Sequence, residues 1–400
     1  KGADFEAIFD PQTGSIYSLK YGNETVISDG NGPKLDALRA FTNNDNWFYA
    51  PWFEHGLHNL IHKATEYKVL NKGNGTLVLS FTVESQAPNA ARIKGGTSSG
   101  KNSIEELTDR KFGSNDFKFI TNQIWTVYPD GSIELQSSIT SNRSSLVLPR
   151  LGYVMKVPQQ YSNFTYYGRG PVDNYADRKS GQFIEQHTNT VAGEFVNFPK
   201  PQDMGNHEDV RWISITNPDG IGFVFVAGDK MSASALHARA QDMVDPANRR
   251  RLLHKYEVPM RKETVLCLDA QVRPLGNASC GPGPMQKYEL RSQPTVFSFI
   301  MLPLERSYSK EELVKKARVQ MPVCMPVLIE RDNNGYLNLQ TSTPGATIHY
   351  SLNGGEDKIY DGPFELISGG NVEAYAISEQ LAKSVKSSAK LPIYVDRSAW

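Results

Sequence analysis

Turn signals recur along almost the whole sequence and divide it into short runs in which apolar and polar residues alternate. Residues 5–9 and 15–19 flank a segment that contains Pro and Gly, which is the pattern of a β-hairpin. Residues 117–127 and 132–139 repeat the pattern around Asp130-Gly131, and Gly readily adopts the positive φ that a tight turn requires. This spacing predicts a mostly β fold.

Only a few segments depart from this alternation of apolar and polar residues. Residues 296–302 are apolar at consecutive positions, which predicts a central strand covered on both faces. Residues 58–67 and 309–319 are the two helix candidates. In the second, Ser309 as N-cap and Glu312 three residues later form a capping box, so we expect a closing or linking helix there.

The length of 400 residues exceeds that of one ordinary domain, so more than one domain is expected. Beyond Pro326 the sequence changes to short strands with turns roughly every ten residues, which is typical of a small β-sandwich. We therefore predict two domains, at residues 1–320 and 326–394.

The charge balance and the cysteine count exclude several classes of protein. The chain has 43 Lys and Arg against 43 Asp and Glu, whereas a nucleic-acid binder needs a basic face. No run approaches the roughly 20 apolar residues that cross a membrane. The three cysteines fit neither a disulfide framework nor a zinc site. We therefore expect no nucleic-acid partner, no membrane partner, no metal and no cofactor.

Two segments are candidates for a binding function. Aromatic residues are dense at residues 47–53, directly after the polar segment 39–45, and sugars are bound by aromatic faces together with fixed polar groups. The alternative, which composition alone favours, is that the aromatic residues belong to the core and the polar residues to a turn. The Pro- and Gly-rich segment 275–284 is either a shaped functional loop or a plain connection.

Three motifs together resemble one family. Arg39-Ala-Phe-Thr-Asn-Asn-Asp45, followed by Trp52 and Gly56-Leu57, is similar to Arg-Ala-Pro-Thr-Asp-Asn-Asp … Trp-x-x-x-Gly-Leu of glycoside hydrolase family 2 β-galactosidases. Residues 167–178 resemble the family's Gly-x-Gly-Pro-x-Glu-Asn-Tyr-x-Asp-Arg motif, and residues 201–212 resemble Pro-Gln-Glu-x-Gly-x-Arg-x-Asp-Val-Arg-Trp. In order and spacing the resemblance covers about residues 5–305.

The resemblance implies an all-β fold, a large galactose mutarotase-like β-supersandwich, followed here by the small C-terminal β-sandwich. In the family this domain packs on the catalytic barrel and closes the rim of the galactoside pocket, while the barrel supplies both catalytic glutamates. It implies as partners the catalytic barrel of the same parent chain and a β-galactoside or glycan substrate. It also implies no catalytic residue here, so the isolated chain is expected to be inactive.

The resemblance also implies a set of residues at the rim of that pocket. Cys280 stands where the family has a Trp under the sugar, and we hypothesise that Trp47 compensates. Other departures, such as Asp203 for Glu and His207 for Arg, leave the choice of galactoside open. The expected rim residues are Arg39, Asn43, Asn44, Asp45, Trp47, Ser279 and Cys280.

The C-terminal segment resembles a second family. Residues 343–351, 361–364 and 369–376 look like the small β-sandwich module at the C-terminus of chitobiases and β-hexosaminidases. This resemblance implies a structural or carbohydrate-associated role, and we assign no site to it. The substrate class and the type of parent enzyme lead us to expect a periplasmic or secreted bacterial protein.

Two alternatives remain open from the residues. One is a stand-alone carbohydrate-binding module. The other is an aldose mutarotase-like enzyme, which needs a general acid and a general base on either side of the sugar ring. His207, His237 or His254 with Glu257 are the candidates for that chemistry.

Overall fold

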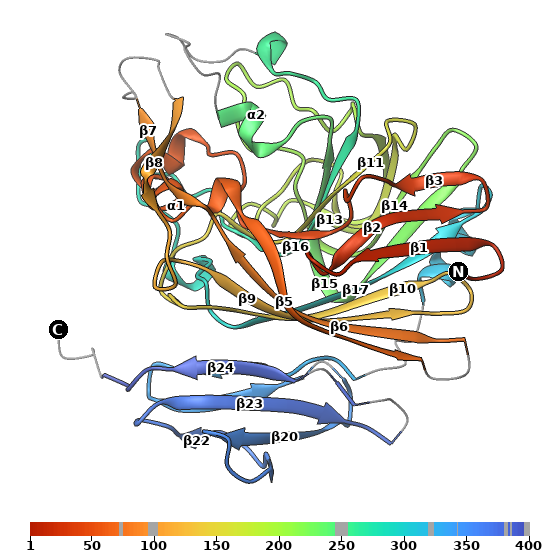
Figure 1. Cartoon of the computed structure of the whole chain (residues 1–400). Coiled ribbons are helices and arrows are strands. Elements are labelled where there is room, and N and C mark those ends of the chain that lie inside the picture. Colours follow the sequence, from red (N-terminus) through yellow and green to blue (C-terminus); the bar gives the residue numbers. More distant parts are fainter. Residues whose placement is uncertain are drawn as a thin grey trace.

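A twelve-stranded sheet forms the centre of the protein, and nine of its strands follow one another in the order β13-β12-β14-β15-β17-β10-β9-β6-β5 (Figure 1). The computed structural model describes residues 1–71, 75–94, 103–244, 255–318, 324–341, 343–379, 383–384 and 386–395. The nine strands are β5 (Ile61–Asn71), β6 (Leu77–Gln86), β9 (Phe119–Val127), β10 (Ile133–Ser141), β12 (Asn163–Gly170), β13 (Phe183–Thr190), β14 (His207–Thr216), β15 (Gly222–Leu236) and β17 (Thr295–Leu304).

The long strand β15 joins this sheet to a second layer. Its first part pairs with β17 along Gly222–Ala227, and its second part pairs with β16 (Thr264–Val272) along Ser232–Leu236. β16 continues to β11 (Arg150–Val157), which pairs with the short β4 (Lys34–Asp36). The two layers enclose the main core, so the predicted all-β fold with a large sandwich is confirmed.

Aromatic side chains fill the space between the layers. The ring of Tyr153 on β11 stacks on Phe297 of β17 with 6.3 Å between centroids, and it meets Phe299 edge-on at 6.2 Å. All three side chains are buried. Residues 296–302 lie in β17, between β15 and β10, so the predicted central strand is confirmed.

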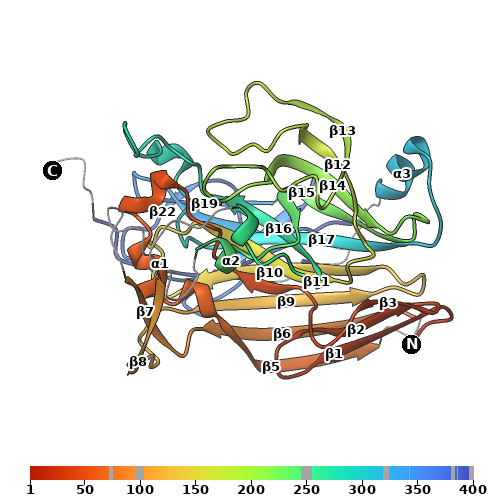
Figure 2. The ribbon, with the colours of Figure 1, turned by 90° about the horizontal axis from the view of Figure 1, so that it is seen from above.

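Both predicted hairpins are present. β1 (Phe5–Asp10) pairs with β2 (Ser15–Tyr21), and β3 (Glu24–Ile27) completes a small N-terminal sheet. β9 and β10 pair around Gly131, whose φ of 84° is the left-handed value that the turn requires. Figure 2 shows this N-terminal sheet at one end of the molecule. At the other end are α1 (Ala50–Glu54) and the hairpin of β7 (Asn89–Lys94) and β8 (Ser103–Lys111).

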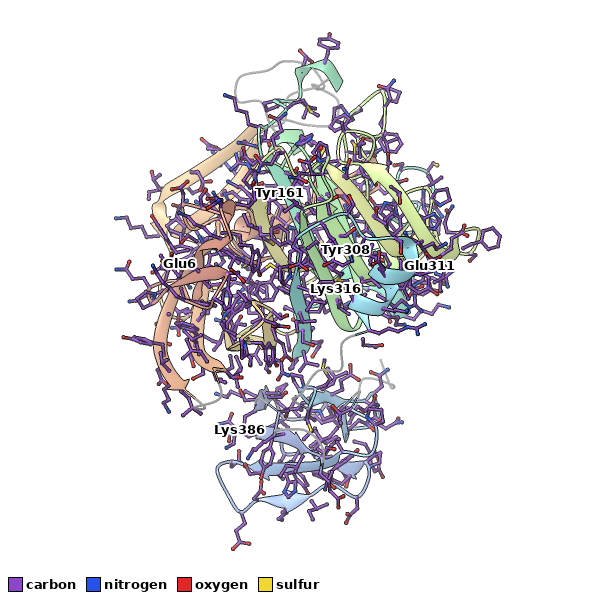
Figure 3. All side chains as sticks on the ribbon, turned by 90° about the vertical axis from the view of Figure 1, so that its right-hand side faces the viewer. Glu6, Tyr161, Tyr308, Glu311, Lys316 and Lys386 are labelled. Carbon is purple, nitrogen blue, oxygen red and sulfur yellow. The ribbon has the colours of Figure 1, made fainter. Side chains whose placement is uncertain are left out.

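One helix prediction is confirmed and the other is wrong. α3 (Lys310–Ala317) has the expected capping box, in which Ser309 Oγ accepts from the Glu312 amide at 3.3 Å. Its residues Leu313 and Ala317 pack on a cluster that includes Trp212 and Val224, and Figure 3 shows the helix against the strands. Residues 58–67 instead form the end of the 3-10 turn η2 (Leu57–Asn59) and most of β5, because pairing with β6 overrides the local helical pattern.

The strands after α3 form a separate small sandwich below the large sheet in Figure 1. Its own core includes Cys324, Val327, Leu337 and Val372. Part of the predicted linker, residues 319–323, lies outside the described residues. The strands are β18 (Leu328–Arg331), β19 (Tyr336–Gln340), β20 (Thr347–Leu352), β21 (Lys358–Ile359), β22 (Phe364–Glu365), β23 (Gly370–Ile377) and β24 (Ser387–Leu391).

The helices are too short or too polar to cross a membrane, as far as the described residues show.

Candidate functional site

The polar segment 39–45 ends in a tight 3-10 turn, η1 (Asn43–Trp47), whose N-cap is Thr42. The Asp45 carboxylate accepts from the Thr42 amide at 2.8 Å and from the Thr42 hydroxyl at 3.0 Å. Asp45 is completely buried. Asp45 therefore closes this turn, and this role explains why an Asp stands three residues after the N-cap Thr.

Two arginines complete the coordination of Asp45. Arg39 donates to both carboxylate oxygens, at 2.8 and 3.2 Å, and Arg273 donates to Asp45 Oδ1 at 2.9 Å. Arg273 also forms a two-point pair with Glu289, at 2.5 and 3.2 Å. Two buried guanidinium groups thus meet two carboxylates. Arg273 and Glu289 lie on either side of the loop 275–284, so this cluster joins the turn to both ends of that loop.

The turn holds the Pro- and Gly-rich loop 275–284 through Asn44. Asn44 Nδ2 donates to the Gly276 carbonyl at 2.8 Å, and its Oδ1 accepts from the Ser279 amide at 3.0 Å and hydroxyl at 2.6 Å. The indole of Trp47 donates to the Ala278 carbonyl at 3.1 Å while 72% of the residue stays exposed. The loop is therefore shaped, and one large aromatic surface beside it is open.

The second motif fixes the same loop from another direction. The Asp177 carboxylate accepts from the amides of Leu275 at 3.1 Å and Gly276 at 2.7 Å. Arg178 Nη2 donates to the Gly276 carbonyl at 2.5 Å and to Asn277 Oδ1 at 3.0 Å. Two segments from distant parts of the sequence therefore converge on one loop.

A pocket of about 340 Å³ lies between these segments. Its lining residues are Thr42, Asn43, Asn44, Asp173, Tyr175, Arg178, Phe198, Gln202, Asp203, Leu275 and Ser279.

The pocket contains a carboxyl group that titrates in an unusual range. The Tyr175 hydroxyl donates to Asp203 Oδ2 at 2.8 Å. Burial raises the pKa of Asp203 to about 6, although Arg39 acts in the opposite direction. Burial also raises the pKa of the neighbouring Asp173. These groups provide both hydrogen-bond donors and acceptors for a polar ligand.

The structure gives the expected rim residues three kinds of position. Arg39 and Asp45 are buried and support the turn from inside. Asn43, Asn44 and Ser279 line the pocket, and Asn43 also accepts from Lys200 at 2.8 Å.

The two remaining rim residues lie outside the pocket lining. Trp47 is exposed and bonds to Ala278, next to Ser279, so it is neither buried nor remote from Ser279; its role as a replacement for the indole stays a hypothesis. Cys280 is exposed and does not line this pocket.

Several contributors were not singled out from the sequence. Tyr175, Asp177, Arg178 and Asp203 lie in the motifs at residues 167–178 and 201–212, which gave the signal for the family but no role for each residue. Arg273 and Glu289 lie outside all three motifs. Only the three-dimensional structure reveals them as partners of the turn.

Of the histidines proposed for acid–base chemistry, His207 and His237 are not among the residues that line the pocket. His207 is completely buried, pairs with Glu194 at 2.7 Å and stacks on Tyr166 at 4.1 Å between ring centroids. Nδ1 of His237 lies 3.2 Å from the carbonyl oxygen of Glu263, and His254 falls outside the described residues. Glu257 lies in the 3-10 turn η3 (Lys255–Glu257). Within the described ranges, no three His, Cys, Asp or Glu side chains gather as metal ligands would.

The two-layer sandwich and the loop that two of the motifs hold define a large all-β domain with a polar pocket at its surface. A family model described as Beta galactosidase small chain matches residues 1–301. Because this match covers well over half of the sequence, the chain belongs to the β-galactosidase small-chain family.

Curated relatives agree with this assignment. A β-galactosidase from Priestia megaterium is 28% identical over 235 residues, which are 59% of this chain and 20% of the relative. A β-galactosidase from Kluyveromyces lactis is 25% identical over 295 residues, which are 73% of this chain and 26% of the relative. The aligned part of this chain thus spans about a quarter of the length of the relatives that it matches.

Among solved structures, a putative aldose 1-epimerase from Escherichia coli K12 aligns with a TM-score of 0.37 and 10% identity. The alignment covers 76% of this chain and 97% of the epimerase. A likeness at this level supports no statement about function.

Proposed function

We propose that residues 1–320 are the last all-β domain of a glycoside hydrolase family 2 β-galactosidase. The domain packs on the catalytic barrel of the same parent chain and shapes one side of the galactoside pocket. The observation that carries this proposal is the convergence of the turn at 42–47 and the segment 177–178 on the loop 275–284. A loop fixed by two separate segments is preorganised to present its surface to a substrate.

A supporting role, without chemistry, fits the bonding of the nearest carboxylates. Glycoside hydrolysis needs two carboxyl groups that face each other across the bond, one of them free to give up a proton. Asp45 is saturated by Arg39, Arg273 and Thr42, and Asp177 is held by two backbone amides. Neither group is available for proton transfer. Asp173 and Asp203 also line the pocket, with raised pKa values, so the assignment of the catalytic glutamates to the barrel follows from the family resemblance.

Trp47 is the residue that we expect to contact sugar. A galactoside has an apolar face that packs on an aromatic ring, while its hydroxyl groups need fixed polar partners. The exposed indole of Trp47 supplies the first, and Asn43 together with Ser279 supplies the second. The position of Cys280, where the family has a Trp, leaves this role to Trp47.

The test is a substitution in the full-length parent enzyme. Trp47→Ala should lower kcat/KM for nitrophenyl β-galactoside by about fivefold or more, since aromatic packing contributes roughly 1 kcal/mol beyond the buried area. Tyr67→Ala is the matched control, because Tyr67 is also an exposed aromatic residue but lies on β5, where its ring stacks on Phe81 of β6 and not beside the loop 275–284. Equal kcat/KM values for Trp47→Ala and the control would remove Trp47 from the proposed site.

The exposure of Trp47 also favours a second candidate, a carbohydrate-binding module that works without a barrel. The two differ in the affinity of the isolated chain. Quenching of Trp47 fluorescence by galactosides with a dissociation constant in the millimolar range or below, tested against Trp47→Phe, supports the binding module. Quenching that appears only in the full-length enzyme supports the pocket-shaping domain.

The small C-terminal sandwich is the appended module in this proposal. Its resemblance to the chitobiase module is carried by residues 343–376. We give it a structural role, because its described strands enclose a core of their own beside the large sheet.

A further inference from the structure

A second cavity, of about 280 Å³, lies at the second layer of the sandwich. β4, β11 and β16 contribute to its wall, together with the start of β5 and residues 234–243. Asp203 lines both this cavity and the pocket at the 275–284 loop, so the two are neighbours. The charged and titratable lining residues of the second cavity include Lys34, Asp36, His62, Arg150, Lys156 and Arg239.

One wall of this cavity is held rigid by buried charges. Arg150 Nη2 donates to Asp36 Oδ1 at 2.5 Å, and Arg150 Nε lies 3.2 Å from Asp269 Oδ1. Arg150 Nη1 also donates to the sulfur of Cys267 at 3.0 Å. Because Arg150 is committed to these partners, it orients the wall and its charge is already balanced.

Lys34 on β4 differs from Arg150 because it has no carboxylate in direct contact among the described residues, and Asp10 attracts it only from a distance. Its ammonium donates to the Gly30 carbonyl at 2.7 Å, and it forms no ion pair with any carboxylate of the described residues. Burial lowers the pKa of Lys34; Asp10 opposes this shift and Lys156 adds to it. A half-buried ammonium of this kind is stabilised by an anion, which would offset the desolvation of the charge.

His62 supplies a neutral polar group beside Lys34. Burial lowers the pKa of His62 to about 4, and Lys34 shifts it in the same direction. Its Nδ1 lies 2.9 Å from the Ser85 hydroxyl, whereas Nε2 has no hydrogen bond to a described residue. A neutral imidazole with one nitrogen unused can exchange a hydrogen bond with a ligand hydroxyl.

From this arrangement we propose that the second cavity binds a sugar acid of monosaccharide size, whose carboxylate pairs with Lys34 and whose hydroxyls bond His62 and the rest of the polar wall. The volume is near the lower limit of about 300 Å³ for small-molecule sites, which fits one ring better than an oligosaccharide. This site is separate from the galactoside pocket of the proposed function and does not need the barrel.

The test is calorimetric titration of the 400-residue chain with D-galacturonate, D-galactose and acetate. The first two differ only at C6, so their comparison isolates the carboxylate, and acetate carries the charge without the hydroxyls. We expect galacturonate to bind at least about tenfold more tightly than galactose or acetate, because one charge-assisted hydrogen bond changes the affinity by about that factor. Equal affinity for galacturonate and galactose, or no binding of galacturonate, overturns the proposal.

Variants locate the binding. Lys34→Met should weaken galacturonate binding about tenfold, whereas Lys34→Arg should retain the preference for the acid because it keeps the charge. Lys63→Met is the matched control: Lys63 is the exposed neighbour of His62 on β5 and should leave the affinity unchanged. An unchanged affinity in Lys34→Met overturns the assignment. An unchanged affinity in Trp47→Ala is expected, and a loss there would place the ligand in the galactoside pocket instead.

Discussion

Replacement of Asp45 by Asn tests whether one buried carboxylate organises the site. Asn has nearly the same shape, but it removes the charge that Arg39 and Arg273 share and puts a donor where an acceptor is needed. Five hydrogen bonds end on Asp45 in the native protein, from Arg39 twice, from Arg273 once and from Thr42 twice. After the change, Glu289 and the more distant Asp203 are left to balance two buried guanidinium groups.

The expected loss follows from the burial of the cluster. The side chains of Arg39, Arg273 and Asp45 are at most 1% exposed, so solvent cannot compensate for the missing charge. Breaking a buried pair in this way costs about 3–5 kcal/mol, which is a large share of the roughly 5–15 kcal/mol that stabilises a domain. We therefore expect Asp45→Asn to lower the free energy of unfolding by about 3–5 kcal/mol.

The assay is urea unfolding followed by circular dichroism and tryptophan fluorescence. Asp130→Asn serves as the control, since Asp130 makes only a turn contact to the Ser132 amide that Asn can also make, and we expect a change within about 0.5 kcal/mol. If Asp45→Asn unfolds within about 1 kcal/mol of the native protein, the cluster is not the anchor of the turn, and the reasoning from its burial is refuted.

Three further predictions concern the same region. Because the pKa of Asp203 is raised to about 6, folding favours the protonated acid, so the free energy of unfolding should fall as the pH rises from about 4 to 6 and stay level above that. In urea titrations the native protein should lose up to about 3 kcal/mol over this range, and Asp203→Asn should not. An equal loss in both proteins contradicts the raised pKa. Asn44→Ala should speed hydrogen exchange of the Ser279 amide, which loses its acceptor, and unchanged protection contradicts the docking of the loop. Iodoacetamide should label the exposed Cys280 and spare the buried Cys267, because burial raises the pKa of the Cys267 thiol to about 11. Labelling is read by mass spectrometry, and a protein in which Cys267 is labelled first contradicts the fold.

Local sequence signals predict the parts of this fold that depend on neighbours in the chain. The two hairpins follow from their turn residues, and α3 follows from Ser309 and Glu312. Pairing between distant strands is not visible in this way. Residues 58–67 have a helix-like pattern, yet most of them become β5 because β6 pairs with them. The division of β15 between two layers likewise depends on where β16 and β17 lie.

The candidate site shows the same limit. The motifs pointed to Asn44, Trp47 and Ser279, and the structure brings these residues together at one loop. Motifs could not reveal that Asp45 is shared with Arg273, because the two are 228 residues apart and Arg273 lies in no motif. They also could not separate a rim residue from a buried support, since that distinction depends on solvent exposure.

The central claim is that this chain contributes the non-catalytic wall of a β-galactosidase pocket. The most direct test measures the hydrolysis of nitrophenyl β-galactoside by the isolated 400-residue chain and by the full-length parent, at equal molar concentration. The account predicts turnover by the parent and none above the uncatalysed rate by the isolated chain. Turnover by the isolated chain that follows its concentration, or a full-length parent that hydrolyses no galactoside, would contradict the claim.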